Sequence, residues 1–171
     1  MYRMLEQQAG RRTVVEFDSF YREHYARLVR ALLVLTSDPA EAEDLAQEAL
    51  SRLYERWDRV QEMDSPQGYL YRTALNLNRK RVRRLLVRTR RAITLRASAP
   101  EDLPAAEDRI ALQAAVARLP RAQREAAVLV ELLGLDGNEA ARVLRISPGA
   151  VRSRLLQARR NLRAHLGGPD A

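Results

Sequence analysis

Cysteine is absent from the 171 residues, and the two histidines, His24 and His165, lie far apart in the sequence. The lack of cysteine excludes disulfide bonds, thiolate metal sites and a thiol nucleophile. Neither histidine belongs to a His-x-x-x-His pair, so the sequence carries no metal-binding motif of that kind. We therefore expect no metal, no cofactor and no built-in redox or metal sensor.

Long apolar runs are missing as well. No run approaches the ~20 residues that a membrane-spanning helix requires, and residues 1–16 lack the apolar core of a signal peptide. No stretch alternates between apolar and polar residues in the manner of a β-strand. These absences predict an all-α protein that has no membrane segment and works in the cytoplasm.

Charge is plentiful and mostly of one sign. The net charge is +8, the pI is near 10.7, and Lys80 is the only lysine among 30 basic residues. Such a balance favours a polyanionic partner, nucleic acid first and a membrane surface second. Arginine suits bidentate contacts with phosphate and guanine, although an Ala- and Arg-rich composition can equally follow from codon usage.

One segment reverses this charge. Residues 37–51 hold five acids and no base. A helix is expected to begin at Asp38, and acids in its first turn are explained by the helix dipole. Asp44, Gln47 and Glu48 lie deeper in the helix, beyond the reach of that explanation. We interpret these three residues as a face that docks on another protein.

A strongly basic helix is predicted over residues 67–84. From Arg72 to Arg96 there are ten basic residues and no acid. Aromatic side chains beside arginines can stack on unpaired bases while the arginines neutralise phosphates, which suits a single-stranded ligand. The alternative is a solvated basic face with its tyrosines half-buried in the core. The candidate nucleic-acid contacts on this helix are Tyr69, Arg72, Asn76, Arg79, Lys80 and Arg83.

Weak periodicity, two prolines and a change from basic to acidic character predict a linker at residues 86–106. It would join two small helical domains, at 17–85 and 107–166, with disordered tails at 1–16 and 167–171. Fully extended, such a linker spans up to ~70 Å. The two domains therefore need not touch.

The C-terminal domain carries the pattern of a helix-turn-helix. Asp136 and Glu139 have the spacing of a capping box at the start of one helix. Ser147 is a suitable N-cap for the next helix, and Pro148 fits its first position. From Ser147 to Leu166 there are five arginines and no acid. In a helix-turn-helix, the first helix supports the second in the major groove of DNA.

The second of these helices has two distinct faces. Val151, Leu155, Ala158 and Leu162 form an apolar stripe at helical spacing. The opposite side and its flanks present the candidate duplex-DNA contacts Arg152, Ser153, Arg154, Leu156, Gln157 and Arg160. The alternative is a basic amphipathic helix that is docked by one face and solvated on the other. The double capping, the tight turn and the one-sided arginines favour DNA.

Three stretches together resemble a known family. They are DPAEAEDLAQEALSRLYERW, YLYRTALNLNRKRVRR and LPRAQREAAVLVELLGLDGNEAARVLRISPGAVRSRLLQARRNL. In this order and spacing they are similar to a bacterial RNA polymerase sigma factor, in the compact two-domain form of the extracytoplasmic-function (ECF) group. The resemblance covers about residues 17–166. The last stretch alone would also suit many response regulators.

The resemblance implies partners for each face. In such proteins the helix that matches residues 41–57 docks on a coiled coil of the polymerase β′ subunit. The helix that matches residues 69–84 engages the minus-ten promoter element as it melts, with Asn76 at a base-contacting position, and the loop at 61–66 captures a flipped base. The linker passes through the polymerase near its active cleft and RNA exit path. The final helix enters the major groove of the minus-thirty-five element.

Three residues depart from the family pattern. Tyr69 stands where tryptophan is usual, and Gln157 stands where a basic residue is frequent. Glutamine prefers adenine whereas arginine prefers guanine, so promoter preference is expected to differ. Arg145 replaces the glycine that is common in the turn, where a left-handed backbone costs other residues ~1 kcal/mol.

Two other functions compete with this interpretation. A stand-alone helix-turn-helix regulator would bind palindromic duplex DNA tightly without polymerase. A metal-dependent nuclease would use Asp38, Glu41 and Asp44, but helix capping already explains acids at that helix start, and no histidine or second acidic cluster completes a site. We expect a protein that is not an enzyme. An anti-sigma factor is a further partner that the resemblance suggests.

Overall fold

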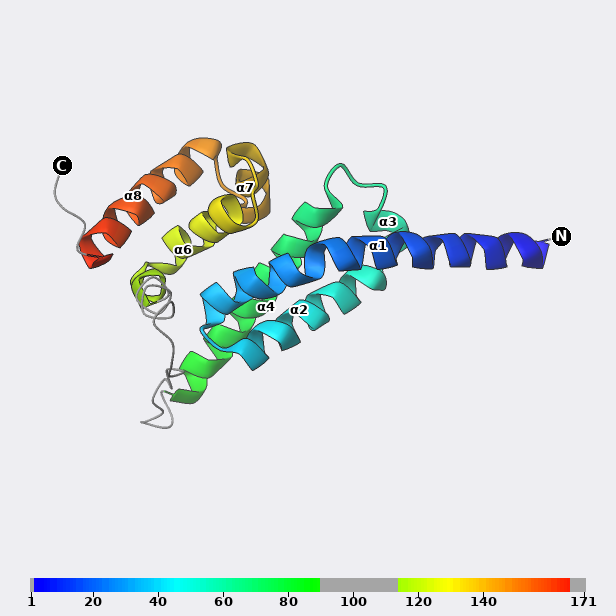
Figure 1. Cartoon of the computed structure of the whole chain (residues 1–171), viewed down its shortest axis with the longest axis horizontal. Helices are drawn as coiled ribbons and strands as arrows, with labels where there is room; N and C mark the ends of the chain where they lie inside the picture. Colours follow the sequence, from blue (N-terminus) through cyan, green and yellow to red (C-terminus); the bar gives the residue numbers. More distant parts are fainter. Residues whose placement is uncertain (1, 90–113, 167–171) are drawn as a thin grey trace.

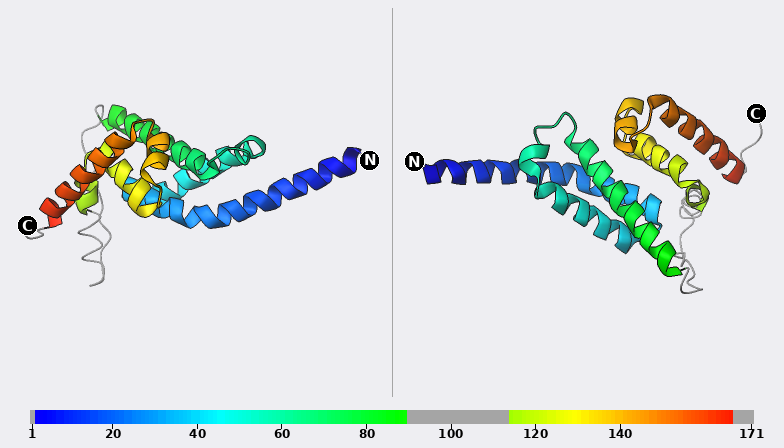
Figure 2. Two further views of the ribbon diagram at one scale, coloured as in Figure 1. Left: turned by 90° about the horizontal axis from the view of Figure 1, so that it is seen from above. Right: turned by 180° about the vertical axis from the view of Figure 1, so that it is seen from behind.

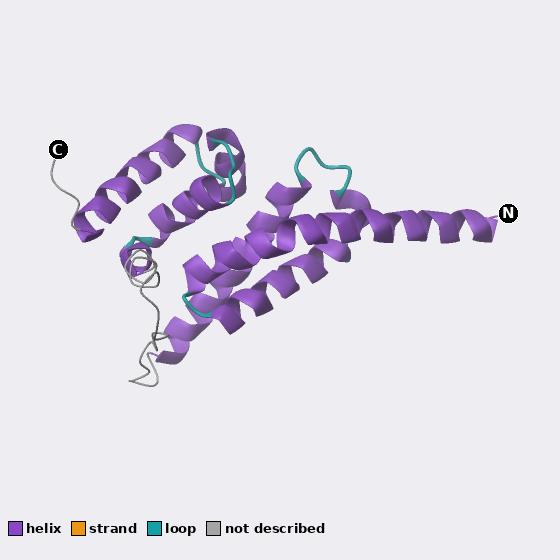
Figure 3. Ribbon diagram, viewed as in Figure 1, coloured by secondary structure: helices purple, strands orange, loops and turns teal. Residues whose placement is uncertain are grey.

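The computed structural model describes the backbone of residues 2–89 and 114–166 and the side chains of residues 16–86 and 114–166. Within these ranges the chain forms helices joined by turns, with no strand (Figure 3). The all-α prediction is confirmed. The helices are α1 (Tyr2–Thr36), α2 (Pro39–Tyr54), α3 (Trp57–Val60), α4 (Pro66–Thr89), α6 (Arg121–Ala127), the π-helical turn η1 (Val128–Leu132), α7 (Gly137–Leu144) and α8 (Pro148–Leu166).

Helix α1 is longer than the sequence predicted. It begins at Tyr2 and not near Phe17, so the expected disordered tail at residues 1–16 is wrong for 2–16. This segment has three arginines, two glutamates, two glutamines and no proline, and arginine, glutamate and glutamine extend a helix rather than end it. Figures 1 and 2 show that the N-terminal part of α1 runs beyond the ends of α2 and α4.

Helices α1, α2 and α4 form the N-terminal half. As predicted, Asp38 is the N-cap of α2, and its side chain accepts a hydrogen bond from the Glu41 backbone N–H at 3.1 Å. Its stripe of small and apolar residues is buried against α1 and α4. One end of this bundle is closed by Trp57, whose ring lies 5.3 Å from that of Phe17 and 5.1 Å from that of Phe20.

Helix α4 extends to Thr89, further than the predicted end near Arg84. Residues 86–89 of the predicted linker therefore belong to this helix. The remainder of that linker, at 90–106, lies outside the described residues. So do residues 107–113, at the start of the predicted C-terminal domain, and the predicted tail at 167–171.

The C-terminal half is built around α8, against which α6 and α7 both pack. The chain from Arg121 to Leu132 forms α6, which continues directly into η1. A π-helical turn accommodates one residue more per turn than an α-helix, and such turns often occur at functional positions. Here η1 leads to Gly134, whose φ of +69° begins the approach to α7.

The two halves are in contact in this structure. Helix α7 packs on α4, and η1 packs on α1 (Figure 1). The buried apolar residues of both halves form one continuous cluster, which includes Leu28 and Leu32 of α1 together with Val128, Leu129 and Val143. The length of the linker allows the two halves either to touch or to stay apart. Burial of apolar surface between the halves stabilises the arrangement in which they touch.

Candidate nucleic-acid and protein interfaces

The helix-turn-helix forms as the sequence predicted. The Asp136 carboxylate accepts hydrogen bonds from the backbone N–H groups of Asn138 and Glu139 at 2.7 and 2.8 Å, and the Glu139 carboxylate accepts one from the Asp136 N–H at 2.8 Å. These backbone hydrogen bonds lower the pKa of Asp136, because they stabilise its charged form. Ser147 caps α8 by accepting from the Ala150 N–H at 3.2 Å. Both helices therefore start where the capping residues specify.

Helix α8 presents the two faces that helical spacing predicted. Val151 and Ala158 are buried, and the other two residues of the apolar stripe are half-buried. Of the six candidate DNA contacts, five are exposed and Arg154 is half-buried. Leu156 is 53% exposed among them. Gln157 accepts a hydrogen bond from the Gln123 amide of α6 at 3.3 Å, so its side chain is partly oriented by its own domain. The exposed residues are Arg152, Ser153, Leu156, Gln157 and Arg160.

The turn between α7 and α8 has a left-handed backbone conformation at Arg145, a position where glycine is usual in the family. Arg145 has φ 58° and ψ 49°, and its backbone N–H donates to the Ala141 carbonyl. This is the helix-ending conformation that glycine adopts at little cost. The replacement of the usual glycine by Arg145 therefore leaves the turn geometry unchanged. Arg145 itself takes on the conformational free-energy cost of the left-handed backbone.

Replacing Arg145 with glycine is expected to stabilise the protein. The substitution removes a left-handed penalty and should raise the free energy of unfolding by about 0.5–1 kcal/mol. Urea unfolding followed by circular dichroism would measure it. Arg142→Gly is the matched control, since Arg142 is exposed within α7 and glycine there should cost about 1 kcal/mol. A loss of stability in both variants would contradict the expectation.

The predicted nucleic-acid face of α4 is only partly open. Asn76, Lys80 and Arg83 are exposed, whereas Tyr69 is half-buried and its hydroxyl accepts a hydrogen bond from Arg56 at 3.0 Å. An open hollow of about 610 Å³ lies beside Tyr69 and Asn76 and is lined by Arg52, Glu55, Arg56, Tyr69, Thr73 and Asn76. The sequence did not indicate Arg56, because it lies in the turn between α2 and α3, where no periodic pattern assigns it a direction.

Arg72 and Arg79 of the same predicted row point elsewhere. Arg79 makes a bidentate ion pair with Glu125 of α6, with Nε–Oε1 at 2.8 Å and Nη2–Oε2 at 2.5 Å. Arg72 donates to the backbone carbonyl of Arg142 in α7. The outward orientation expected of these two arginines is therefore wrong in this structure, while their role in nucleic-acid binding stays a prediction. Helical spacing places residues on a common stripe, but it cannot show that a second half of the chain covers part of that stripe.

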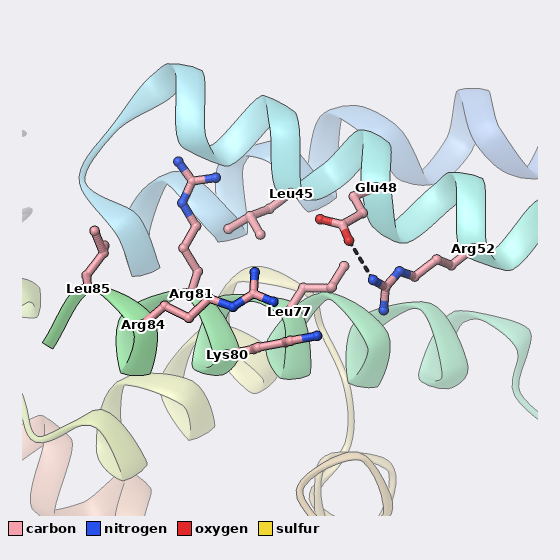
Figure 4. A pocket seen from close by; sticks show the side chains of 8 residues that line it. All are labelled: Leu45, Glu48, Arg52, Leu77, Lys80, Arg81, Arg84 and Leu85. Atoms are coloured by element: carbon pink, nitrogen blue, oxygen red, sulfur yellow. Dashed lines mark hydrogen bonds and ion pairs between the residues drawn. The ribbon is translucent and has the colours of Figure 1, made fainter. Parts of the chain in front are cut away.

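The acidic face of α2 is exposed at all three predicted residues, Asp44, Gln47 and Glu48. Glu48 pairs with Arg52 at 2.6 Å and lines a groove of about 360 Å³ between α2 and α4 (Figure 4). Lys80 lines the same groove, so the predicted protein-docking face and the predicted nucleic-acid face share an edge. The other lining residues are Leu45, Arg52, Leu77, Arg81, Arg84 and Leu85.

At the start of α2, Glu41 is turned inward and pairs with Arg81 at 2.5 Å. Burial raises the pKa of Glu41 despite the opposing effect of Arg81. Among the residues that the structure describes, no three His, Asp or Glu side chains are grouped so as to hold a metal ion. None of the described helices is both long enough and apolar enough to cross a membrane.

Comparison with known proteins identifies the family to which the chain belongs. The sequence matches the family models of Sigma-70 region 2 over residues 20–89 and of Sigma-70 region 4 over residues 109–162. It is 31% identical over 170 residues to the RNA polymerase sigma-E factor of Streptomyces coelicolor, covering 92% of this chain and 89% of that protein. It is 32% identical over 154 residues to the ECF RNA polymerase sigma factor SigL of Mycobacterium tuberculosis, covering 86% and 87%.

Two solved structures share the fold. The sigma factor RpoE in complex with the anti-sigma factor NepR from Bartonella quintana has a TM-score of 0.81 at 21% identity, covering 91% of this chain and 99% of that one. CnrH in complex with the cytosolic domain of CnrY has a TM-score of 0.71 at 25% identity, covering 98% of each chain. The family matches span both halves, which excludes the stand-alone helix-turn-helix regulator. The chain belongs to the sigma-70 family of RNA polymerase sigma factors, in its ECF group.

Proposed function

We propose that this sigma factor binds core RNA polymerase through α2 and directs it to promoters through α4 and α8. The observation that carries the proposal is the arrangement of α8. A capped helix is anchored by Val151 and Ala158, and its opposite face exposes arginines, a serine and a glutamine. Hydrogen-bonding side chains on a helix that a second helix supports are what readout in the major groove requires.

For α8, we propose contacts with the minus-thirty-five element by Arg152, Ser153, Arg154, Leu156, Gln157 and Arg160. Arginine supplies contacts to guanine and phosphate, and Gln157 suits adenine. Leu156 is apolar and exposed, which suits a contact with a thymine methyl group. Because α6 holds the Gln157 amide, this residue is oriented before DNA arrives.

For α4, we propose that Tyr69, Asn76, Lys80 and Arg83 contact the minus-ten element, joined by Arg72 and Arg79 once these are released from the C-terminal half. The hollow beside Tyr69 and Asn76 combines an aromatic ring with amide, guanidinium and carboxylate groups. Such a set can stack on an unpaired base and hydrogen-bond its edge. The loop at 61–66 lies next to this face in the sequence and is proposed to hold a flipped base.

For α2, we propose that Asp44, Gln47 and Glu48 dock on the β′ subunit, while the linker contacts the polymerase near its cleft, including the β subunit. Catalysis then belongs to the polymerase, and this chain contributes recognition. The domain roles follow as region 2 at 17–85 and region 4 at 107–166. A cytoplasmic location follows from the partner.

An anti-sigma factor is proposed as a further partner. The sigma factor RpoE, which shares this fold, was solved in complex with the anti-sigma factor NepR, and CnrH was solved in complex with the cytosolic domain of CnrY. The present chain exposes apolar side chains on both halves, including Met63 and Leu132. A partner that covers both halves would compete with polymerase for them.

Run-off transcription tests the proposal directly. Core polymerase free of sigma factor, from a related bacterium, is combined with this protein on genomic promoter fragments. We expect discrete start sites only when the protein is present, and transcripts reduced about fivefold or more by Arg152→Ala, as expected for the loss of a base contact worth ~1–3 kcal/mol. Arg159→Ala is the matched control, because Arg159 is an exposed arginine of α8 that pairs with Glu131. Absence of transcripts, with tight duplex binding by the protein alone, would refute the proposal.

A further inference from the structure

The turn between α2 and α3 carries two consecutive side chains of opposite charge, Glu55 and Arg56. Both are exposed, and both line the hollow of about 610 Å³ beside Tyr69 and Asn76. Neither belongs to α4, the helix that the proposed function assigns to the minus-ten element. The next residue, Trp57, is 6% exposed and packs against α1, so it anchors the backbone of the turn. The buried tryptophan therefore fixes the place from which the two charged side chains reach the hollow.

Arg56 is further oriented by Tyr69. Its Nη1 donates a hydrogen bond to the Tyr69 hydroxyl at 3.0 Å. The tyrosine backbone is fixed in the first turn of α4, because its N–H donates to the Ser65 carbonyl at 3.1 Å and its carbonyl accepts from the Thr73 hydroxyl at 2.9 Å. Tryptophan, which is usual at this position in the family, could not accept the arginine, since an indole has a donor and no acceptor. The contact therefore depends on the tyrosine of this chain, and it uses only one of the several N–H groups of Arg56.

The charges on this wall of the hollow disfavour an anionic group. The Glu55 carboxylate only accepts hydrogen bonds, whereas the Arg56 guanidinium only donates them. A phosphate would meet a like charge at Glu55, which costs free energy. Arg52 also lines the hollow but is paired with Glu48 at 2.6 Å. The wall therefore suits a neutral, planar group that has acceptors along one edge and donors along the next.

Guanine is the DNA base that matches this wall best. Its O6 and N7 atoms are adjacent acceptors that take a bidentate pair of hydrogen bonds from an arginine. Its N1–H and N2 amino groups are adjacent donors that match the two oxygens of a carboxylate. Adenine has an amino group in place of O6, thymine has no amino group, and cytosine has only one donor group. An unpaired guanine offers both edges at once, as bases in single strands do.

We propose that Glu55 and Arg56 are specificity-determining residues that select an unpaired guanine in this hollow. Arg56 donates to O6 and N7, Glu55 accepts from N1 and the N2 amino group, and the Tyr69 ring provides a surface on which the base stacks. The inference rests on the proposed function, in which α4 meets the single strand of the minus-ten element. It goes beyond that role, because residues outside α4 determine which base is bound.

Base analogues that each lack one group of guanine test the assignment on the free chain, which contains the whole hollow. Fluorescence anisotropy at low salt uses a labelled strand of about 12 nucleotides, all thymine except for one central guanine. Matched strands carry inosine, which lacks the N2 amino group, or 7-deazaguanine, which lacks N7. We expect each analogue strand to bind about threefold or more weakly than the guanine strand, as expected for the loss of part of a bidentate base contact.

Alanine variants assign each contact to its residue. The difference between guanine and inosine should disappear in Glu55→Ala, and the difference between guanine and 7-deazaguanine should disappear in Arg56→Ala. Asp58→Ala and Arg59→Ala are the matched controls and should keep both differences, because both side chains are exposed on α3 and neither is among those that line the hollow. Equal binding of guanine and its analogues by the unchanged chain would overturn the proposal. So would base preferences that survive in Glu55→Ala and Arg56→Ala, or that are lost in the controls.

These experiments fail independently of the proposed function. A chain that directs transcription with core polymerase but binds guanine and its analogues equally is a sigma factor without this selectivity. A chain that selects guanine through Glu55 and Arg56 but yields no transcripts keeps the base site and loses the proposed function. Circular dichroism on each variant confirms that its helices are retained.

Discussion

Replacing Asp44 with arginine is expected to abolish polymerase-dependent transcription while the protein stays folded. Asp44 is exposed on α2, in the face that we propose for the β′ subunit. A positive charge placed against a surface complementary to acids costs several kcal/mol, and about 2–4 kcal/mol corresponds to a loss of binding of roughly 30- to 1000-fold. Co-purification with core polymerase and run-off transcription would measure this loss.

Asp18→Arg is the control for that substitution. Asp18 is an exposed acid of α1 whose partner is Arg22, one turn further along the same helix, and the two variants change the net charge equally. We expect Asp18→Arg to bind polymerase normally. Equal binding by both variants would show that α2 does not dock through Asp44, and equal losses would show an effect of net charge alone.

Truncating Trp57 to alanine is expected to cost about 3–5 kcal/mol of folding free energy, the largest loss that we foresee from one core substitution. The ring is 6% exposed and packs against Phe17 and Phe20 of α1, so it joins α3 to that helix. Thermal unfolding followed by circular dichroism would measure the loss, since the variant lacks the only tryptophan.

Trp57→Phe separates packing from polarity. The indole Nε1 is buried and has no hydrogen-bond partner among the described residues. An unsatisfied buried donor contributes a penalty that phenylalanine removes, which offsets part of the lost volume. We expect Trp57→Phe to cost less than about 1.5 kcal/mol. A loss as large as that of Trp57→Ala would show that the indole makes a polar contact that the packing account omits.

Local signals in the sequence predicted most of the elements. The Asp136–Glu139 capping box and the Ser147 cap act over a few residues, so the chain itself carries the information that places the ends of α7 and α8. The two faces predicted for α8 from helical spacing were also right, because one apolar stripe suffices to orient a helix on its own domain. The same reasoning was incomplete for α1, whose N-terminal extension has no apolar stripe to reveal it.

The errors on α4 have a different cause. Arg72, Asn76 and Arg79 share one helical stripe, yet Asn76 is exposed and the two arginines contact the C-terminal half. The partner of Arg79, Glu125, lies 46 positions further along the chain. A charged residue in an amphipathic helix is ordinarily expected at the surface, so nothing near Glu125 in the sequence marks it as buried.

The sequence by itself determined the helical class, the helix-turn-helix and the acidic and basic faces, because capping, periodicity and net charge are local or additive properties of the chain. Only the tertiary structure decided which of the basic residues are available. Apolar surface on α1, α4, η1 and α7 is buried in a single cluster, and that contact brings Arg79 to a carboxylate removed from water. Burial and pairing of this kind depend on which helices meet, and a linker long enough to allow either arrangement leaves the outcome to packing.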